Sequence, residues 1–480
     1  MVRSDHHLAL RRWAKQLGGI FCLRMVHQHM VVVVDAAAAN EVLGADEGLN
    51  KGLEPDLSDR LMSFTGHRTL FSADTGSPHW HLVRKGVAPA FSPTNIRRAM
   101  PRIHAILDTV IGGLARVRGA DVDINNVALR YAMDVTGAVC FGAVFGTSAA
   151  FDDARTNDLF AVLRGAMGEL HKRATNPART LLLHLPEVRA GRRLFRRFRS
   201  HMHALLQEVK ARGEPTADDG SVAALLLRLR DPATGAPLPD ELLAAEFGVF
   251  FTAGIESAGN AITWTLHLVS QRPEVEAALV AELGKAGLLA SKENPSPPRI
   301  GLDDLARLPY LGCVCKEAMR YKPVASTGTT RLNRRTLTLG GHMIPAGALL
   351  LVPFDAVHRC NFERPDEFWP ERWLDPTAGY CAAASAQHQT GSPEASPLSS
   401  PGGGAPKRFL PFSTGPRQCM GRSLAVVMHD VAVATLLARF SFCLADRMGG
   451  AAGVEAAELQ KIFRNFEEAA GWKRVVPFGR

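Results

Sequence analysis

The sequence contains no framework of closely spaced cysteines. Its eight cysteines stand at positions 22, 140, 313, 315, 360, 381, 419 and 443, and only Cys313 and Cys315 are near neighbours. Small domains held by disulfides use a denser and more regular spacing. Cys419 also lacks the nearby Cys or His residues that a zinc finger requires. We therefore expect free thiols and a reducing intracellular compartment.

The sequence also lacks a recognisable membrane anchor. Residues 1–16 include five charged side chains, a pattern that fits neither a signal peptide nor a membrane-spanning helix. No uninterrupted apolar run approaches the roughly 18 residues that a span needs. We expect a protein that is soluble or peripheral to a membrane, or a sequence without its natural N-terminus.

Charged residues are few, at 21% of the chain, and their balance is a net charge of +9 with a pI of about 9.3. This mild basicity suits an acidic partner or an anionic membrane surface. In Glu187–Met202, arginines oppose Leu194, Phe195 and Phe198. Such a pattern is typical of a peripheral membrane contact, and equally of a helix whose arginine face is solvated. No aromatic platform accompanies the arginines, so we expect no nucleic-acid partner.

The most informative segment is 411–422, which reads Pro-Phe-Ser-Thr-Gly-Pro-Arg-Gln-Cys-Met-Gly-Arg. Cys419 precedes a predicted helix, and a helix N-terminus favours a thiolate. A lone thiolate suits haem iron, where its electron density favours O–O cleavage. Gly421 lets the backbone approach a flat macrocycle, Phe412 can cover the sulfur, and Arg417 can reach a propionate. A nucleophile with a distant histidine base, or an inert buried cysteine, are the alternatives.

The complete pattern Phe-x-x-Gly-x-Arg-x-Cys-x-Gly resembles the cysteine-ligand loop of the cytochrome P-450 family, in its eukaryotic-type form. The resemblance implies haem b as the cofactor, with Cys419 as the axial ligand of its iron. It also implies a mainly α fold with a small β lobe, in which haem lies between a long central helix and the cysteine-ligand loop. We expect a single domain over residues 1–480. Residues 376–406, rich in Ala, Ser, Gly and Pro, predict a disordered insertion.

A long helix is predicted over Asp240–Gln271. Pro239 and Pro273 bracket it, and its central part is apolar nearly all round, which predicts burial. Gly254 lies in this central part. Because glycine costs about 1 kcal/mol relative to alanine inside a helix, its presence indicates a close neighbour.

The run Ala253-Gly254-Ile255-Glu256-Ser257 in this helix is similar to the oxygen-binding groove of the family. The resemblance assigns Ala253 and Gly254 to the haem surface, and Glu256 and Ser257 to proton delivery. The family usually has threonine where Ser257 stands. Serine keeps the hydroxyl but loses the methyl group that restrains its rotamer, so we hypothesise looser proton delivery. An ordinary pairing of Glu256 with a base in the core is the alternative.

Two further constellations gain meaning from the resemblance. Trp80 and Arg84 share a helix face, and the family places them and Arg331 against haem propionates. Glu317 and Arg320 resemble the Glu-x-x-Arg pair of the family. Arg372 would be the third member of an ion network that locks the cysteine loop. Each pair alone is equally typical of an ordinary surface contact.

The implied reaction inserts one oxygen atom of O₂ into a small, hydrophobic organic substrate. No flavin or nicotinamide fingerprint stands in the sequence, so electrons are expected from an NADPH-dependent flavoprotein reductase or a ferredoxin. Lys407, Arg408 and Arg422 flank the cysteine loop and would attract such an acidic partner. A haem-thiolate isomerase or dehydratase working without O₂, and a non-catalytic haem-binding protein, are the alternatives. The sequence does not specify the substrate.

Overall fold

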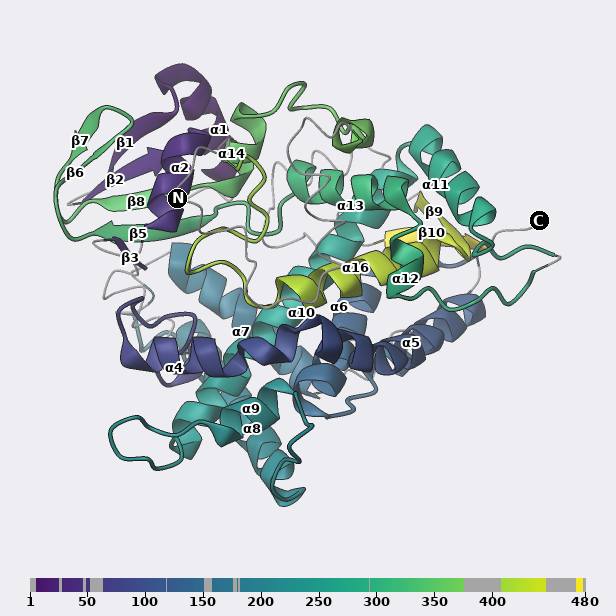
Figure 1. Cartoon of the computed structure of the whole chain (residues 1–480), viewed down its shortest axis with the longest axis horizontal. Coiled ribbons are helices and arrows are strands. Elements are labelled where there is room, and N and C mark those ends of the chain that lie inside the picture. The colour runs from purple at the N-terminus through teal and green to yellow at the C-terminus, as the bar shows by residue number, and fades with distance from the viewer. Residues whose placement is uncertain are drawn as a thin grey trace. The chain divides into compact units, whose positions relative to one another are not determined.

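This computed structural model describes residues 6–25, 28–45, 49–51, 64–117, 119–150, 158–175, 179, 182–292, 294–374, 407–445 and 472–477. Helices dominate these residues, and the strands are few and short, which confirms the predicted mainly α fold with a small β lobe (Figure 1). The contacts divide the chain into two compact units. The expected single domain therefore stays a prediction, and the expected insertion at 376–406 lies outside the described residues.

The first unit comprises residues 1–4, 53–259 and 446–473. Its helices and short strand are α4 (Pro78–Val87), α5 (Pro93–Arg116), β4 (Asp121–Asp123), α6 (Ile124–Thr136), α7 (Asp158–Thr175), α8 (Pro186–Ala211), α9 (Val222–Arg228) and the first part of α10 (Asp240–Ser270). Short 3₁₀ or π turns cover Ala88–Phe91, Gly137–Phe141 and Thr147–Ala150. Prolines begin α4, α5 and α8, where a missing N–H costs no hydrogen bond.

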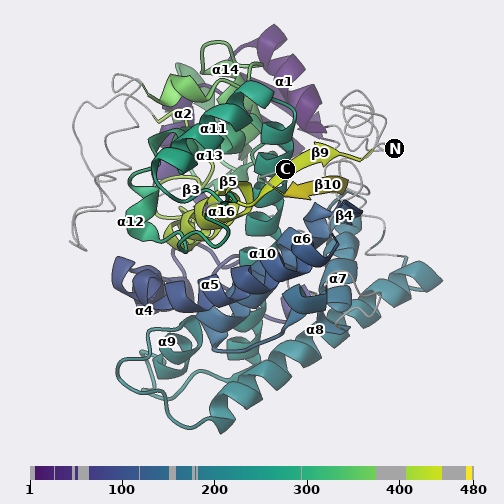
Figure 2. The ribbon, with the colours of Figure 1, turned by 90° about the vertical axis from the view of Figure 1, so that its right-hand side faces the viewer.

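Helix α8 runs beside α7 (Figure 2), and its packing favours the alternative of a solvated arginine face for Glu187–Met202. Its apolar stripe is buried: Phe195, Phe198 and Met202 are each 1% exposed. Phe198 stacks on Phe64 with ring centroids 4.6 Å apart. The arginine side of the helix faces solvent. An interfacial helix must present its apolar face to lipid, and here that face already packs inside the unit.

Helix α10 begins at the expected residue, Asp240, and ends at Ser270, one residue before its predicted end. Its length and composition alone would allow it to cross a membrane, and 56% of its most apolar window is buried. The uninterrupted apolar runs of this helix are short, as expected, because Ser, Thr and Gly residues break them, whereas a helix-long average tolerates these residues. The division between the two units falls between Gly259 and Asn260.

The second unit comprises residues 5–52, 260–445 and 474–480. Its helices are α1 (His6–Leu17), α2 (Ala36–Gly44), the last part of α10, α11 (Pro273–Lys285), α12 (Leu302–Leu305), α13 (Pro309–Tyr321), α14 (Phe354–Cys360) and α16 (Arg422–Leu437), with a 3₁₀ turn at Pro370–Trp373. Its strands are β1 (Ile20–Met25), β2 (Gln28–Val33), β3 (Leu49–Lys51), β5 (Thr329–Asn333), β6 (Leu337–Leu339), β7 (His342–Ile344), β8 (Leu349–Val352) and β9 (Phe440–Leu444). Strand β10 (Trp472–Pro477) spans the division between the units.

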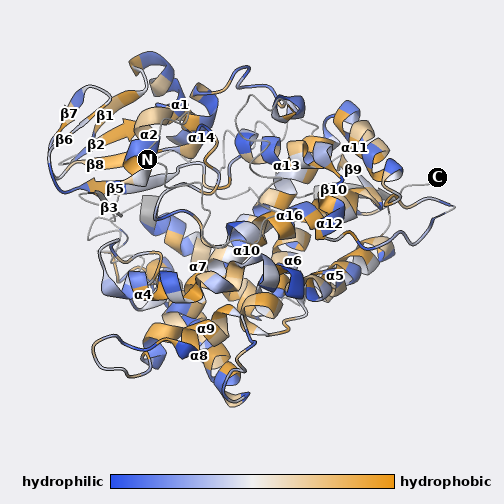
Figure 3. Cartoon of the chain, in the orientation of Figure 1, coloured by the Kyte–Doolittle hydropathy of each residue, from blue (hydrophilic) through white to orange (hydrophobic). Residues whose placement is uncertain are grey.

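The β lobe is a five-stranded sheet in the order β1-β2-β8-β5-β3. A hairpin forms its edge, with β1 antiparallel to β2, while β2 pairs in parallel with β8. The side chains alternate between the two faces, as a period of two requires. Val31 and Val33 pack with α2, whereas Val32 packs on the other face with Leu10 and Ala14 of α1. The strands of this sheet are correspondingly coloured as mostly hydrophobic in Figure 3.

Candidate functional site

The segment around Cys419 forms a tight loop in the second unit. The N–H of Cys419 donates to the carbonyl of Phe412 at 2.9 Å, and the N–H of Gln418 donates to the carbonyl of Gly415 at 3.0 Å. Gly421 is the N-cap of α16, which begins at the next residue. The thiol of Cys419 is exposed. An exposed thiol just before a helix N-terminus lies where a thiolate is stabilised, as the sequence suggested.

Helix α2 fixes the shape of this loop. Gly415 has a φ of +73°, and a Cβ placed there would lie 2.1 Å from the carbonyl oxygen of Leu43. Asn40 donates to the carbonyl of Lys407 at 2.7 Å, at the start of the same segment. Because a side chain at position 415 would collide with backbone, only glycine fits this conformation.

The residues expected to surround the sulfur are half-buried. Phe412 and Arg417 both belong to this class, and the guanidinium of Arg422 lies 6.0 Å from the ring centroid of Phe412. Lys407 donates to the hydroxyl of Thr414 at 3.3 Å. Burial, and then the charge of Arg422, lower the pKa of the Lys407 ammonium. Cations therefore gather on both sides of the loop.

Glu317, Arg320 and Arg372 are brought together as a buried ion network. Glu317 and Arg320 are 0% exposed and form a bidentate ion pair, with hydrogen bonds of 2.8 and 2.9 Å. Arg372 donates to the same carboxylate at 3.2 Å. The indole N–H of Trp373 and the backbone N–H of Trp369 complete its acceptor positions, at 2.9 and 2.8 Å. A charge removed this far from water needs such a full set of partners.

His358 links this network to the cysteine loop, and the sequence analysis missed it. Its Nε2 accepts from the N–H of Leu410 at 2.8 Å, and its Nδ1 lies 3.3 Å from the carbonyl of Arg320. Burial lowers the pKa of this imidazole to about 3, so it is neutral and Nδ1 is the donor. Phe409 packs between His358 and Trp373, with ring centroids 5.5 and 4.8 Å away. No periodicity or motif signals a contact between residues so distant in sequence.

Arg331 is a buried cation on β5, in the same unit as Cys419. It is 2% exposed, and its Nη1 donates to the Thr329 hydroxyl and the Thr330 carbonyl at 3.1 and 2.9 Å. Its Nη2 is buried without a partner among the described residues. Burial lowers the pKa of this guanidinium to about 10, and no carboxylate in the described part of the chain opposes the shift. A buried guanidinium in this state calls for an anion.

The predicted groove lies in the first unit, in the middle of α10. A Cβ on Gly254 would lie 2.6 Å from the hydroxyl of Thr136 on α6, which is the close neighbour that its glycine predicted. Ser257 donates its hydroxyl hydrogen to the carbonyl of Ala253 at 2.7 Å. Ala253 and Ser257 are exposed, which departs from the burial expected of this stretch. The helix thus presents a shallow, hydroxyl-bearing surface at this turn.

Glu256 lies beside this surface, half-buried. Burial raises the pKa of its carboxyl, and the guanidinium of Arg164 on α7 opposes that shift. A carboxyl that holds its proton more readily than usual suits a proton donor. The nearby Arg164 also gives weight to the alternative of a pairing in the core.

The Trp80 and Arg84 pair is formed on α4, also in the first unit. Trp80 is 4% exposed, and the guanidinium carbon of Arg84 lies 5.8 Å from the centroid of its ring. The stacking fixes the direction of a half-buried cation. On the same unit, Glu246 of α10 was missed: its buried carboxylate accepts from the N–H of Leu70 at 2.8 Å and contacts His79 at 2.7 Å.

Comparison with known proteins identifies relatives over nearly the whole chain. The family model described as cytochrome P450 matches residues 2–449. Cytochrome P450 714D1 of Oryza sativa subsp. japonica is 26% identical over 90% of this chain and 72% of its own length. Cyclooctat-9-en-7-ol 5-monooxygenase of Streptomyces melanosporofaciens is 26% identical over 81% of this chain and 76% of its own length. A crystal structure of a cytochrome P450, CYP102L1, covers 92% of this chain and 93% of its own, with a TM-score of 0.76 and 21% identity.

The residues in the second unit fit the cofactor of that family. A haem carries two propionates, and Arg331 offers a buried N–H that has no acceptor among the residues that the structure describes. A thiolate at a helix N-terminus is a suitable ligand for its iron, and the loop holding Cys419 is already folded on itself. The chain belongs to the cytochrome P450 family, as an oxidoreductase of the monooxygenase class whose cofactor is haem b.

Proposed function

We propose that this chain inserts one oxygen atom of O₂ into a small, hydrophobic organic substrate, with Cys419 as the axial ligand of haem iron. The bound haem supplies the oxygen chemistry. The observation that carries the proposal is the cysteine loop, in which an exposed thiol precedes α16 and is held by backbone hydrogen bonds and by α2. The relative named as a monooxygenase supports the class of reaction.

The surrounding residues are proposed to hold the cofactor by its edges and faces. Arg331, Arg417 and Arg84 would bind the propionates: Arg331 is buried, Arg84 stacks on Trp80, and Arg417 lies two residues before Cys419. Trp80 would orient Arg84 through the stacking contact at 5.8 Å. Phe412 would cover the sulfur, and Gly421 would let the backbone approach the haem on that side. Ala253 and Gly254 would lie against the opposite face of the haem, where their small size leaves space.

Glu256 and Ser257 are proposed to deliver protons. Burial raises the pKa of the Glu256 carboxyl, which keeps a proton available nearer to neutral pH. The Ser257 hydroxyl hydrogen is bound to the Ala253 carbonyl at 2.7 Å, so its oxygen is open as an acceptor. A rotation about χ1 would release that hydrogen, and serine lacks the methyl group that restrains this rotation in threonine.

The electrons are proposed to come from an acidic partner, either an NADPH-dependent flavoprotein reductase or a ferredoxin. Arg408 is exposed beside the cysteine loop, and Lys407 and Arg422 add positive charge at its two ends. Complementary charge raises the rate of encounter between such proteins.

Replacing Cys419 with serine or alanine tests the proposal. We expect haem-loaded protein to lose the ferrous–carbonyl absorption band that a thiolate ligand produces, because the ligand sets the electronics of the iron. The matched control is Cys443→Ser, an exposed thiol outside the loop, which should leave the band unchanged. A band that survives in the Cys419 variants would refute the assignment, and substrate conversion without any reductant would favour an isomerase or dehydratase.

Replacing Ser257 with threonine tests the proton-delivery role. The added methyl group restricts the hydroxyl to fewer rotamers, so we expect a larger fraction of consumed reductant to appear as oxygenated product and less as peroxide. The fraction is measured as product formed per NADPH oxidised. An unchanged ratio in Ser257→Thr would separate this residue from proton delivery.

A further inference from the structure

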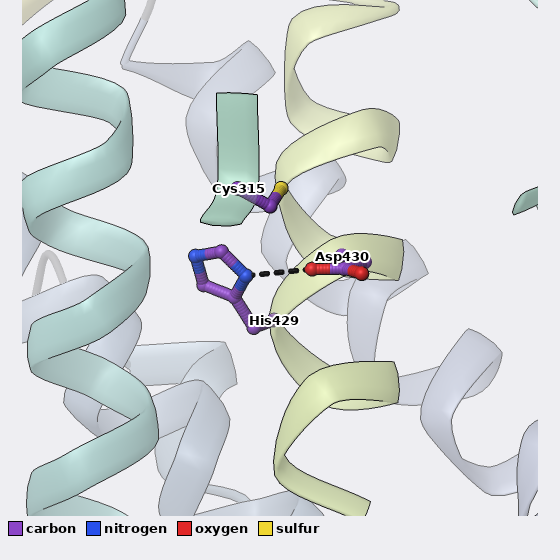
Figure 4. Close-up of side chains that lie close together, drawn as sticks. All are labelled: Cys315, His429 and Asp430. Atoms are coloured by element: carbon purple, nitrogen blue, oxygen red, sulfur yellow. Dashed lines mark hydrogen bonds and ion pairs between the residues drawn. The ribbon is translucent and has the colours of Figure 1, made fainter. Parts of the chain in front are cut away.

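The polar cluster of Cys315, His429 and Asp430 in the second unit is complete in itself. Nδ1 of His429 lies 2.7 Å from a carboxylate oxygen of Asp430 (Figure 4). The hydroxyl of Thr265 lies 2.8 Å from Nε2 of His429 and can donate to it, and the thiol of Cys315 can donate to Asp430. Each donor in this cluster has an acceptor, so the cluster links α13 to α16 without a further ligand.

The carboxyl of Glu246 is different, because it joins α10 to a stretch of the first unit that is distant in sequence. Glu246 is 0% exposed. Its Oε1 accepts from the N–H of Leu70 at 2.8 Å and lies 2.7 Å from Nε2 of His79. Its Oε2 is buried without a hydrogen-bond partner among the described residues. Burial raises the pKa of this carboxyl, and the bond to His79 opposes that shift. The buried group therefore depends on two contacts, both with residues 70–79.

The contact with His79 meets α4 at its first turn. Ser77 is the N-cap of α4 but makes no side-chain hydrogen bond to it, and the first turn contains no acidic residue. A negative charge near a helix N-terminus is stabilising. Glu246 offers such a charge from another helix, through its bond to the second residue of α4. This contact holds the start of α4 against α10.

Helix α4 carries the pair that is proposed to hold a haem propionate. Trp80 follows His79 directly, and Arg84 stacks on Trp80 at 5.8 Å. Because α4 has only 10 residues, a contact at its first turn fixes how the whole helix is rotated about its axis, and with it the direction of Arg84. Glu246 also shares a face of α10 with Ala253, two helical turns further on. One carboxyl therefore connects both surfaces of this unit that are proposed to meet the haem.

We propose that Glu246 is a positioning residue for the haem: through His79 it sets the direction in which α4 presents Arg84. This role rests on the proposed contact between Arg84 and a propionate. In this role Glu246 acts without touching the cofactor, so its effect passes through α4 and disappears when Arg84 is removed. That dependence separates positioning from a general contribution to stability.

The test is the rate at which the full-length ferric protein loses haem to excess apomyoglobin, followed by absorbance. We expect Glu246→Ala, His79→Leu and Arg84→Ala each to speed haem loss by about 10-fold, as for other residues that orient a ligand-contacting group. The double variant Glu246→Ala/Arg84→Ala should lose haem about as fast as Arg84→Ala alone, and not about 100-fold faster than the parent, because the two residues act as one unit. His79→Gln, whose amide can also donate to Glu246, should keep a rate close to that of the parent.

Asp134→Ala is the matched control. Asp134 is a buried carboxylate of the same unit, and it accepts hydrogen bonds from Thr147 and Ser148 at 2.7–3.0 Å, away from α4. It should lower the urea midpoint, as Glu246→Ala does, but leave the rate of haem loss close to that of the parent.

The outcomes separate the positioning role from the haem contact on which it rests. If Arg84→Ala speeds haem loss but Glu246→Ala or His79→Leu does not, the positioning role alone is wrong. The role is equally wrong if Asp134→Ala speeds haem loss as much as Glu246→Ala, or if the double variant multiplies the two single effects. A parent rate in Arg84→Ala would refute the proposed propionate contact, and the role of Glu246 with it.

Discussion

The carboxylate of Glu317 is the acceptor for four residues, and none of its charge reaches water. Replacing it with glutamine keeps the volume but leaves Arg320 and Arg372 buried without a counter-charge. We expect Glu317→Gln to reduce the free energy of unfolding by about 3–5 kcal/mol. Urea unfolding followed by tryptophan fluorescence measures this loss.

The control for that variant is Glu371→Gln. Glu371 is exposed and accepts one hydrogen bond, from the hydroxyl of Tyr310 at 2.8 Å. An exposed contact of this kind contributes little, so a change within about 0.5 kcal/mol is expected. If the two variants lose similar amounts of stability, the network around Glu317 does not have the energetic role that its burial indicates.

His358 makes stability depend on pH in the acid range. Its folded-state pKa is lowered by burial to about 3, from an ordinary value of 6.5. Below pH 6.5 the unfolded chain binds a proton that the folded chain does not bind, so stability falls as the pH falls towards about 3. At pH 5 the loss from this residue is about 2 kcal/mol. His358→Gln should flatten this part of the stability profile, measured by urea unfolding between pH 7 and pH 4.

His342 provides the comparison, because its side chain is exposed on β7. We expect His342→Gln to retain the slope of the parent protein. If His358→Gln keeps the parent dependence of unfolding free energy on pH, then other groups cause the acid sensitivity. The same variant also reports on the loop, since His358 is the acceptor for the N–H of Leu410.

Helix α10 packs closely on α6 where Gly254 faces Thr136. Alanine has the better helix propensity by about 1 kcal/mol, yet its Cβ would lie 2.6 Å from the threonine hydroxyl. We expect Gly254→Ala to be destabilising by about 1–3 kcal/mol, as for other overpacked sites. The double variant Gly254→Ala/Thr136→Ala should recover part of the loss, because the obstructing atoms are gone. Thermal unfolding of the single and double variants measures this coupling.

Gly168→Ala is the matched control in the same unit. Gly168 lies within α7, is exposed, and has no neighbour within 4 Å of an added Cβ. We expect it to stabilise the protein by about 0.5–1 kcal/mol through helix propensity alone. If Gly254→Ala destabilises the protein and Gly168→Ala stabilises it, then packing, and not backbone propensity, selects the glycine in α10. If both substitutions change the stability in the same direction, that explanation is wrong.

Elements with strong local signals could be predicted from the sequence. A proline pair brackets α10, and the helix begins at the predicted residue, Asp240. Contacts over long sequence separations could not be predicted, as for His358 and Leu410, because periodicity carries no information about partners. For helix α8, amphipathicity identified an apolar face, but only the fold shows that Phe64 covers it. The roles of the haem-contacting residues stay predictions.

At the scale of the whole molecule, the net charge of +9 favours association with acidic proteins. We expect reduction by an acidic electron donor to slow as ionic strength rises from about 0.05 to 0.5 M, because screening shortens the range of attraction. Arg408→Glu, beside the cysteine loop, should slow reduction at low salt. Stopped-flow measurement of haem reduction gives the rates.

Arg192→Glu makes the same change in net charge on the exposed face of α8. It should leave the rate of reduction close to that of the parent protein. If Arg192→Glu slows reduction as much as Arg408→Glu does, then overall charge, and not the surface beside Cys419, governs the encounter.

The fit of Gly415 against Leu43 has a consequence for the order of biosynthesis. A ribosome releases α2 more than 300 residues before it releases the cysteine loop, and the loop depends on α2 for its conformation. The nascent chain must therefore keep its first helices available while most of the polypeptide is still being translated. If Cys419 holds the prosthetic group as proposed, the haem can be captured only in the last stage of synthesis, when the cysteine loop reaches α2.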